Sequence, residues 1–313
     1  MGYNLFDTHA DTPYEMYKRG FALRDNPLHI SLDKTARLHK YCQCMAIWSD
    51  SALTDGEAFT SFKKIYEQFK AKTEADGGGK ICRSYDDIIT AHAEDKAAFV
   101  MTVEDARLLC GDISRLDVLA DYGIKMLTMT WQGESCIGGA FDTNARLTEF
   151  GRAVACGCAR KKIITDISHS NVNTALEIID IASESDAPVI ATHSNSYAVY
   201  AHDRNMTDEV FSRLVGCGGI VGISLAVQHI SDKPDITCED VFRHIDYYAE
   251  REGIEYICLG CDYDGIETTP RDLQNISMIE NLAECMLRHN YTEDNVRAVF
   301  SENARLYMKK HLK

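Results

Sequence analysis

The first residues that could do chemistry lie near the start of the chain, in the stretch NLFDTHADTP at positions 4–13. A short apolar run there places His9 and Asp11 two residues apart. If the run is a strand, side chains at i and i+2 leave from the same face, so the imidazole and the carboxylate point the same way. Two such ligands can bind one cation. An isolated His-x-Asp is more often structural, so the interpretation needs partners elsewhere in the chain.

Further residues of ligand type follow apolar runs later in the sequence: Glu104, His169, His193, Asp262 and Asp264. Three imidazoles with two or three carboxylates suit divalent ions such as zinc, manganese or iron. Because a single catalytic zinc keeps three protein ligands and a water, this larger set predicts two divalent metal ions. Such a pair lowers the pKa of a bound water so that it attacks near neutral pH. Asp166, shortly before His169, could orient one ligand.

Eight short apolar runs rich in β-branched residues must position these side chains. They are NLFDTH, YCQCMAIWS, AAFVMTVE, IKMLTMTW, KIITDISH, APVIATHS, GIVGISLAV and YICLGCDYD. Between them lie segments with helical periodicity, for example residues 57–72, 113–123, 173–185 and 239–253, with helix starts expected at Thr207 and Thr292. Apolar strands that alternate with helices predict a parallel sheet covered on both faces. Eight units predict a (β/α)8 barrel in one domain, residues 1–313, and a doubly wound open sheet is the alternative.

The barrel hypothesis explains where the ligand-type residues stand. Catalytic residues of such barrels come from the C-terminal ends of several strands, and here each candidate follows the end of a run. Arg204 and Asn205 fall in the loop after the sixth run, on the same side. An arginine there can hold a carboxylate through two hydrogen bonds.

Composition narrows the class of protein. The 33 Lys and Arg against 48 Asp and Glu give a formal charge of -15, and no basic cluster offers a nucleic-acid surface. The N-terminus shows no signal-peptide pattern and no apolar run is long enough to cross a bilayer, so we expect a soluble, cytoplasmic protein without a membrane partner. The 12 cysteines are then expected to be reduced and buried. Cys258 and Cys261, three apart in a strand, would face opposite sides and bind nothing together.

The segments DTHADTP, VEDA, TDISHSN, APVIATHSNSYAV followed by RN, and LGCDYDGI resemble, in this order, the membrane (renal) dipeptidase family of zinc metallopeptidases. The resemblance covers nearly the whole chain and implies a soluble, bacterial-type member with a (β/α)8 barrel and two zinc ions. It implies that His9 and Asp11 bind one metal, that His169 and His193 bind the other, and that Glu104 bridges them.

The same resemblance implies roles around the substrate. Asp262 would hold the attacking water and meet the amino group of a dipeptide, while Arg204, with Asn205 beside it, would take the C-terminal carboxylate. Holding both ends selects dipeptides, including those that end in a D-residue, and the resemblance suggests a homodimer. Trp131 stands where the best-known animal members carry a histidine that helps to polarise the scissile carbonyl, and an indole N–H is a neutral donor only.

Two other functions stay open on the residues alone. An amidohydrolase-type enzyme on the same barrel would open a cyclic amide or lactone, because fold and metals do not fix the substrate. Such relatives usually bridge their metals with a lysine, whereas the bridging candidate here is Glu104. A non-catalytic binding protein is the other alternative, although it would not need an activated water.

Overall fold

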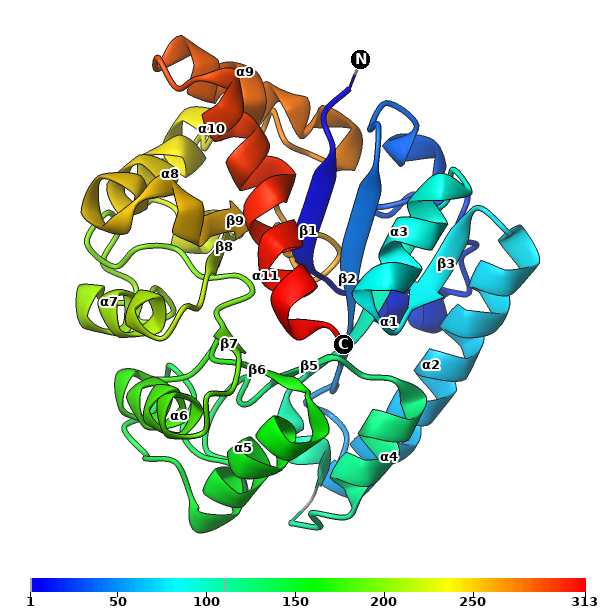
Figure 1. Cartoon of the computed structure of the whole chain (residues 1–313), viewed down its shortest axis with the longest axis vertical. Coiled ribbons are helices and arrows are strands. Elements are labelled where there is room, and N and C mark those ends of the chain that lie inside the picture. Colours follow the sequence, from blue (N-terminus) through cyan, green and yellow to red (C-terminus); the bar gives the residue numbers. More distant parts are fainter. Residues whose placement is uncertain (1, 110) are drawn as a thin grey trace.

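The computed structural model describes residues 2–109 and 111–313. Parallel strands lie at the centre and helices surround them (Figure 1). The strands are β1 (Leu5–Ala10), β2 (Tyr41–Trp48), β3 (Gly79–Cys82), β4 (Ala97–Glu104), β5 (Met126–Thr128), β6 (Ile164–Asp166), β7 (Val189–Ile190), β8 (Val221–Ile223) and β9 (Ile257–Leu259). The α-helices are α1 (Thr12–Arg19), α2 (Asp55–Asp76), α3 (Tyr85–Ala93), α4 (Arg115–Tyr122), α5 (Glu149–Lys161), α6 (Val172–Glu184), α7 (Asp208–Gly216), α8 (Cys238–Glu252), α9 (Glu280–Arg288), α10 (Glu293–Arg297) and α11 (Asn303–His311).

Eight of the strands form a barrel. They pair in the order β7-β6-β5-β4-β2-β1-β9-β8, with every pair parallel. The ring closes where Ala191, just after β7, bridges to Val221 at the start of β8. The predicted (β/α)8 barrel is therefore confirmed, and the open sheet is excluded.

One strand was not expected from the sequence. None of the eight predicted runs includes it: Gly79 begins β3, which pairs with β4 outside the barrel ring. A Cβ at Gly79 would lie 2.2 Å from the ring of Phe99, so the strand can approach β4 only without a side chain there. Gly77 ends α2 in the left-handed conformation, as expected of a glycine after a helix.

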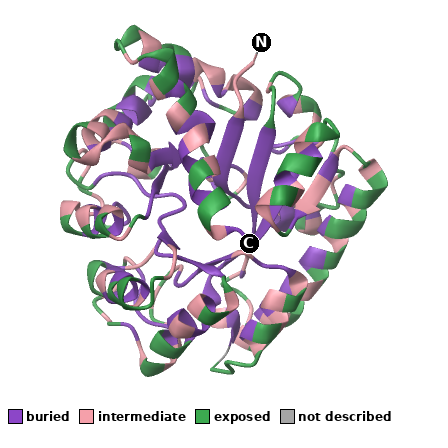
Figure 2. Ribbon diagram, viewed as in Figure 1, coloured by how far each residue is buried: buried purple, intermediate pink, exposed green. Residues whose placement is uncertain are grey.

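Helix α11 covers the N-terminal end of the barrel (Figure 1). Its Tyr307 hydroxyl donates to the carbonyl of Val189 at 2.8 Å, and Met308 is fully buried against residues of the barrel interior such as Phe6. Figure 2 shows the strands of the barrel largely buried, β3 partly buried, and the exposed residues concentrated on the outer helices. With one end sealed, the loops at the C-terminal end are left to form a site.

Several helices begin where a side chain accepts a hydrogen bond from one of their first backbone N–H groups. Thr207 accepts from the N–H of Val210, and Thr292 forms a capping box with Asn295, so both predicted helix starts are confirmed. In the described part of the chain, every helix falls short of the apolar length that crossing a bilayer requires. Cys258 lies in β9, whereas Cys261 follows the end of that strand, and the two pack in different hydrophobic clusters.

Candidate metal centre and active site

The candidate residues gather at the C-terminal end of the barrel. A cavity of about 790 Å³ is lined there by side chains from several loops, including Asp11, Glu104, His169, Arg204 and Asp262. His9 and His193, both 1% exposed, do not line the cavity themselves but lie against Glu104. Residues from five strand ends are thus brought together by closure of the barrel.

Glu104, the last residue of β4, lies at the centre of the cluster. Its Oε2 is 3.3 Å from Nε2 of His9, and its Oε1 is 2.8 Å from Nε2 of His169 and 3.7 Å from Nε2 of His193. The two oxygens of one carboxylate therefore face different histidines. This is the geometry expected of a carboxylate shared by two cations.

Asp11 occupies the N-cap position of α1 but makes no side-chain cap to that helix. Its Oδ2 lies 3.2 Å from Nε2 of His9, while its buried Oδ1 has no hydrogen-bond partner among the described residues. An aspartate at an N-cap normally accepts from the helix backbone. Here the carboxylate faces the imidazole of His9 instead, and Oδ1 remains available to a ligand.

The other two histidines converge on each other. The Nε2 atoms of His169 and His193 lie 2.9 Å apart, and Nδ1 of His193 is 2.8 Å from the hydroxyl of Thr192. That hydroxyl donates to Asp166 at 2.6 Å. Asp166 is thus linked to His193 through Thr192, the arrangement expected of a carboxylate that orients a ligand.

The protonation states follow from burial and charge. Burial lowers the pKa of His169 to about 4, helped by Arg204, and burial also lowers the pKa of His193 well below its ordinary value. Burial alone would raise the pKa of Glu104, but His9 and His169 hold it below the ordinary value. Neutral imidazoles facing an ionised carboxylate are the states that metal ligands require.

Negative charge dominates around His9. Burial opposes a charged His9, yet Glu104 and Asp11 raise its pKa well above the ordinary value. Burial raises the pKa of Asp262 to about 7, and Glu104 adds to the effect. A cation between these groups would relieve their mutual repulsion.

The donor set fits divalent metal. Two groups of three ligand atoms lie within 4.8 Å of one another, His9–Glu104–His193 and His9–Asp11–Asp262. All donors are imidazole nitrogens or carboxylate oxygens, the types that catalytic zinc uses.

Arg204 adds a buried positive charge to the same cavity. It is 6% exposed, and its guanidinium donates to the carbonyl of His193 at 3.1 Å and weakly to the hydroxyl of Ser194 at 3.4 Å. Its Nε has no hydrogen-bond partner, and no ion pair joins it to a carboxylate within residues 2–109 and 111–313. A buried guanidinium that contacts no carboxylate directly is suited to an anionic group of a ligand.

Asn205 and Trp131 lie differently. The amide of Asn205 donates to the carbonyls of Tyr200 and His229 at 2.9 and 2.8 Å, so it fastens two loops and is not among the residues that line the cavity. Its contact with substrate stays a prediction. Trp131 lines the cavity, with its ring 6.3 Å from that of His169.

The sequence interpretation missed several residues of the cavity wall. Trp48 packs edge-on against Tyr14 at 4.9 Å and against Trp131 at 5.0 Å, which gives one side of the cavity an aromatic wall. His29 and His229, which were not among the candidate residues, also line the cavity. Trp48 is the last residue of β2 and His229 lies in the loop after β8, and this position near strand ends was the available signal.

Comparison with known proteins places the chain in a family. A model of the membrane dipeptidases, peptidase family M19, matches residues 2–310. An uncharacterised protein from the PQQ-III 3′ region of Acinetobacter calcoaceticus is 32% identical over 184 residues, which are 55% of this chain and 58% of that protein. Dipeptidase tcpJ of Claviceps purpurea is 27% identical over 223 residues, 70% of this chain and 52% of that protein. The chain thus spans little more than half the length of these relatives.

The fold is shared with a solved structure. A metallo peptidase from Rhodobacter sphaeroides, liganded with a phosphinate mimic of the dipeptide L-Ala-D-Ala, matches with a TM-score of 0.91 and 24% identity over 99% of this chain and 100% of that one. The match extends over the whole barrel. Because the family model also runs from β1 to the last turn of α11, the chain belongs to the membrane dipeptidase family, peptidase family M19.

Proposed function

We propose that this protein is a metal-dependent dipeptidase that hydrolyses the peptide bond of free dipeptides. The observation that carries the proposal is one cavity in which the donor cluster around Glu104 lies with the buried, unpaired guanidinium of Arg204. A substrate with a carboxylate near its scissile bond matches both features. Membership of the family, the dipeptidase of Claviceps purpurea and the dipeptide mimic bound by the Rhodobacter sphaeroides enzyme support this substrate class.

We assign His9 and Asp11 to one metal ion and His169 and His193 to a second, with Glu104 contacting both. The donor types suit two zinc ions. When bound, such a pair would acidify a water molecule and polarise the scissile carbonyl. Asp166, through Thr192, keeps the His193 ring oriented toward the cluster.

Asp262 is the residue that we assign to proton transfer. Its Oδ1 lies 3.8 Å from Nε2 of His9 and its side chain borders the cavity. There it can take the proton of the attacking water, pass it to the leaving amine, and accept a hydrogen bond from the substrate's amino group. Arg204 would hold the opposite end of the substrate, so the two residues together would measure its length. Trp131 and Trp48 would exclude water along one wall.

The decisive experiment measures amino-acid release from a panel of L-L and L-D dipeptides, with metal content determined in the same preparation. We expect cleavage that rises with metal occupancy up to two ions per chain. The tripeptides and the N-acetylated and amidated forms of the same dipeptides should react far more slowly. A fully metallated protein that cleaves none of the dipeptides would contradict the proposal, and cyclic amides and lactones in the same panel test the alternative.

Two further predictions concern the protein as a whole. We infer a cytoplasmic location and a homodimer. Light scattering checks the second, and a monomeric mass would contradict it.

A further inference from the structure

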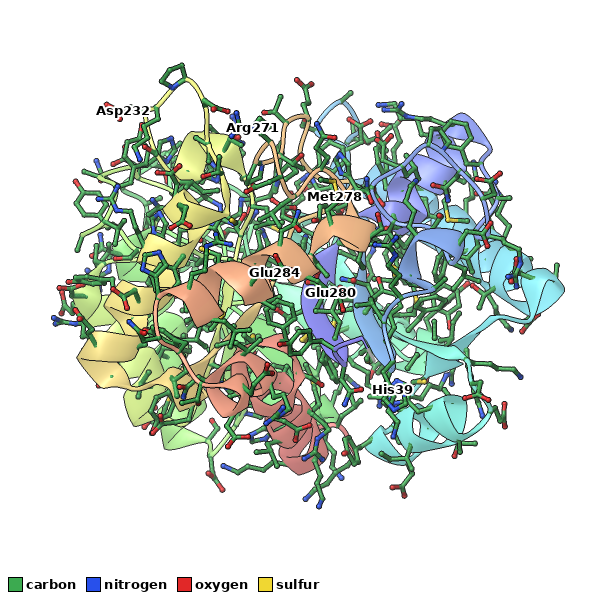
Figure 3. The ribbon with its side chains drawn as sticks, turned by 90° about the horizontal axis from the view of Figure 1, so that it is seen from above. His39, Asp232, Arg271, Met278, Glu280 and Glu284 are labelled. Atoms are coloured by element: carbon green, nitrogen blue, oxygen red, sulfur yellow. The ribbon has the colours of Figure 1, made fainter. Side chains whose placement is uncertain are left out.

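A second cluster of metal-binding side chains lies where α8 begins and α9 ends. Cys238 and Glu239 form the first turn of α8, and Cys285 belongs to the last turn of α9. The two thiol sulfurs and one oxygen of Glu239 all lie within 4.8 Å of one another. Helices α8 and α9 pack against each other on the outside of the barrel (Figure 1). In Figure 3, α9 is the helix on which Glu280 and Glu284 are labelled.

The cluster is organised from inside to outside. The thiols of Cys238 and Cys285 are buried and free of disulfides, whereas the carboxylate of Glu239 lies half exposed above them. Its Oε1 accepts from Arg288 at 2.8 Å, and its Oε2 lies 2.6 Å from Nε2 of His289. Those contacts fix the carboxylate in place over the sulfurs.

His289 is itself held in position. Its ring stacks on Phe242 of α8 with centroids 4.2 Å apart and an interplanar angle of 15°. It follows Cys285 by four residues, so both side chains leave the same side of α9. The His289 imidazole, at the end of α9, therefore contacts the Glu239 carboxylate while its ring packs on α8.

We propose that Cys238, Cys285 and Glu239 bind one thiophilic divalent cation, with zinc the best fit, that ties the start of α8 to the end of α9. Two thiolates and a carboxylate supply three positions of a tetrahedral zinc site, and a water can supply the fourth. Thiolates favour zinc over harder ions such as magnesium. The contact of His289 with Glu239 is the kind of outer hydrogen bond that orients a metal ligand.

The charges balance in this site. Binding would release the two thiol protons to solvent, so the two thiolates neutralise the two charges of the cation. Glu239 then remains shared between the cation and its present partners, Arg288 and His289. The proposal is independent of the proposed dipeptidase function, because the donors around Glu104 are only nitrogen and oxygen and produce no metal–thiolate signal.

The test uses the full chain, stripped of metal in the presence of a reductant and then titrated with Co²⁺. We expect a near-ultraviolet sulfur-to-cobalt charge-transfer band, and one more Co²⁺ per chain in the natural protein than in Cys285→Ser or Cys238→Ser. The matched control is Cys156→Ser, a half-exposed thiol on α5 outside the cluster, which should keep the band and the stoichiometry.

A variant at the surface keeps the proposal testable if the cysteine variants fold poorly. Glu239→Gln removes the carboxylate charge without changing the buried thiols, and we expect the Co²⁺ affinity of this site to fall by about 10-fold or more. The proposal is overturned if the natural protein shows no thiolate band, if the band survives both cysteine substitutions, or if Glu239→Gln binds Co²⁺ as tightly as the natural protein.

Discussion

At the scale of single residues, the site contains buried polar groups that lack hydrogen-bond partners among the described residues. Arg204 is a buried cation without an ion pair among the described residues, and Asp11 keeps a buried oxygen without a hydrogen bond there. Unsatisfied buried polar atoms are costly, so a fold keeps them mainly where a ligand completes them. Arg204 and Asp11 both line the cavity, where a ligand can complete these groups.

Arg204→Ala should weaken the use of free dipeptides. Loss of charge-assisted hydrogen bonds to the substrate carboxylate, worth about 1.5–3 kcal/mol, corresponds to a fall of about 10- to 100-fold in kcat/KM. Dipeptide amides lack this carboxylate, so their slower cleavage should change little. Steady-state kinetics on both substrate forms checks this, with Arg213→Ala on the exposed side of α7 as the control. Equal losses on both forms would argue against a carboxylate contact.

Asp262→Asn should separate metal binding from turnover. The amide cannot accept the proton of the attacking water, so kcat should fall by about 100-fold to 10,000-fold. Metal content should stay that of the natural protein if Asp262 transfers protons and does not bind metal. Loss of one metal ion in elemental analysis would instead make Asp262 a ligand, and full turnover would remove it from the reaction.

At the scale of the elements, the strands end in turns with uncommon backbone conformations. His169 and Asp262 have φ values of 67° and 61°, in the left-handed region that residues with a side chain rarely adopt. Such conformations cost of order 1–3 kcal/mol each and concentrate at functional sites. These conformations turn the chain sharply after β6 and β9. The turns direct the side chains of His169 and Asp262 toward the cavity.

Gly265 allows the loop after β9 to approach the donors. A Cβ at this position would lie 2.3 Å from Oδ2 of Asp11 and 2.5 Å from Oδ1 of Asp262. Gly265→Ala should therefore displace both carboxylates and lower kcat/KM by about 100-fold, the order expected for a shift of about 1 Å.

Metal content and unfolding temperature should accompany this measurement. We expect reduced metal uptake with a fold that persists, and Gly56→Ala, where a Cβ meets nothing within 4 Å, should leave both activity and metal unchanged. Natural activity in Gly265→Ala would show that the carboxylates can move aside freely.

At the scale of the whole molecule, α8 connects loops from two strands. Nδ1 of His244 accepts from the N–H of Ser196 at 3.1 Å, and its Nε2 lies 3.0 Å from the carbonyl of Ile230. The imidazole thus joins the loop after β7, which carries Arg204, to the turn after β8. This arrangement needs a neutral ring, because a proton on Nδ1 would face the N–H of Ser196.

The link makes stability depend on pH. Burial lowers the pKa of His244 to about 4 from its ordinary 6.5, so below pH 6.5 the unfolded chain binds a proton that the folded protein excludes. Stability therefore falls as pH drops from 6.5 towards 4, and His244 alone should remove about 2 kcal/mol of the free energy of unfolding between pH 7 and pH 5. Urea unfolding of the natural protein and of His244→Gln checks this. The variant should lose less stability over that range, and parallel curves would contradict the assignment.

The sequence by itself determined the class of fold and selected the candidate donors. Eight apolar runs alternating with helical segments predicted the barrel, because local periodicity follows from which side chains must be buried. His9, Glu104, His169, His193 and Asp262 could be chosen in advance, since the ends of parallel barrel strands meet at one rim.

Only the tertiary structure decided how these residues meet and what surrounds them. Sequence distance says nothing of the 2.8 Å between Glu104 and His169, of Trp48 against Trp131, or of Cys238 beside Cys285. Asp11 is the clearest example of what the sequence could not give. An aspartate just before a helix is expected to cap it, whereas the carboxylate of Asp11 contacts His9. The sequence pattern indicates which side chains are buried along each segment. Contacts between distant segments depend on barrel closure and side-chain packing, which cannot be inferred from a local pattern.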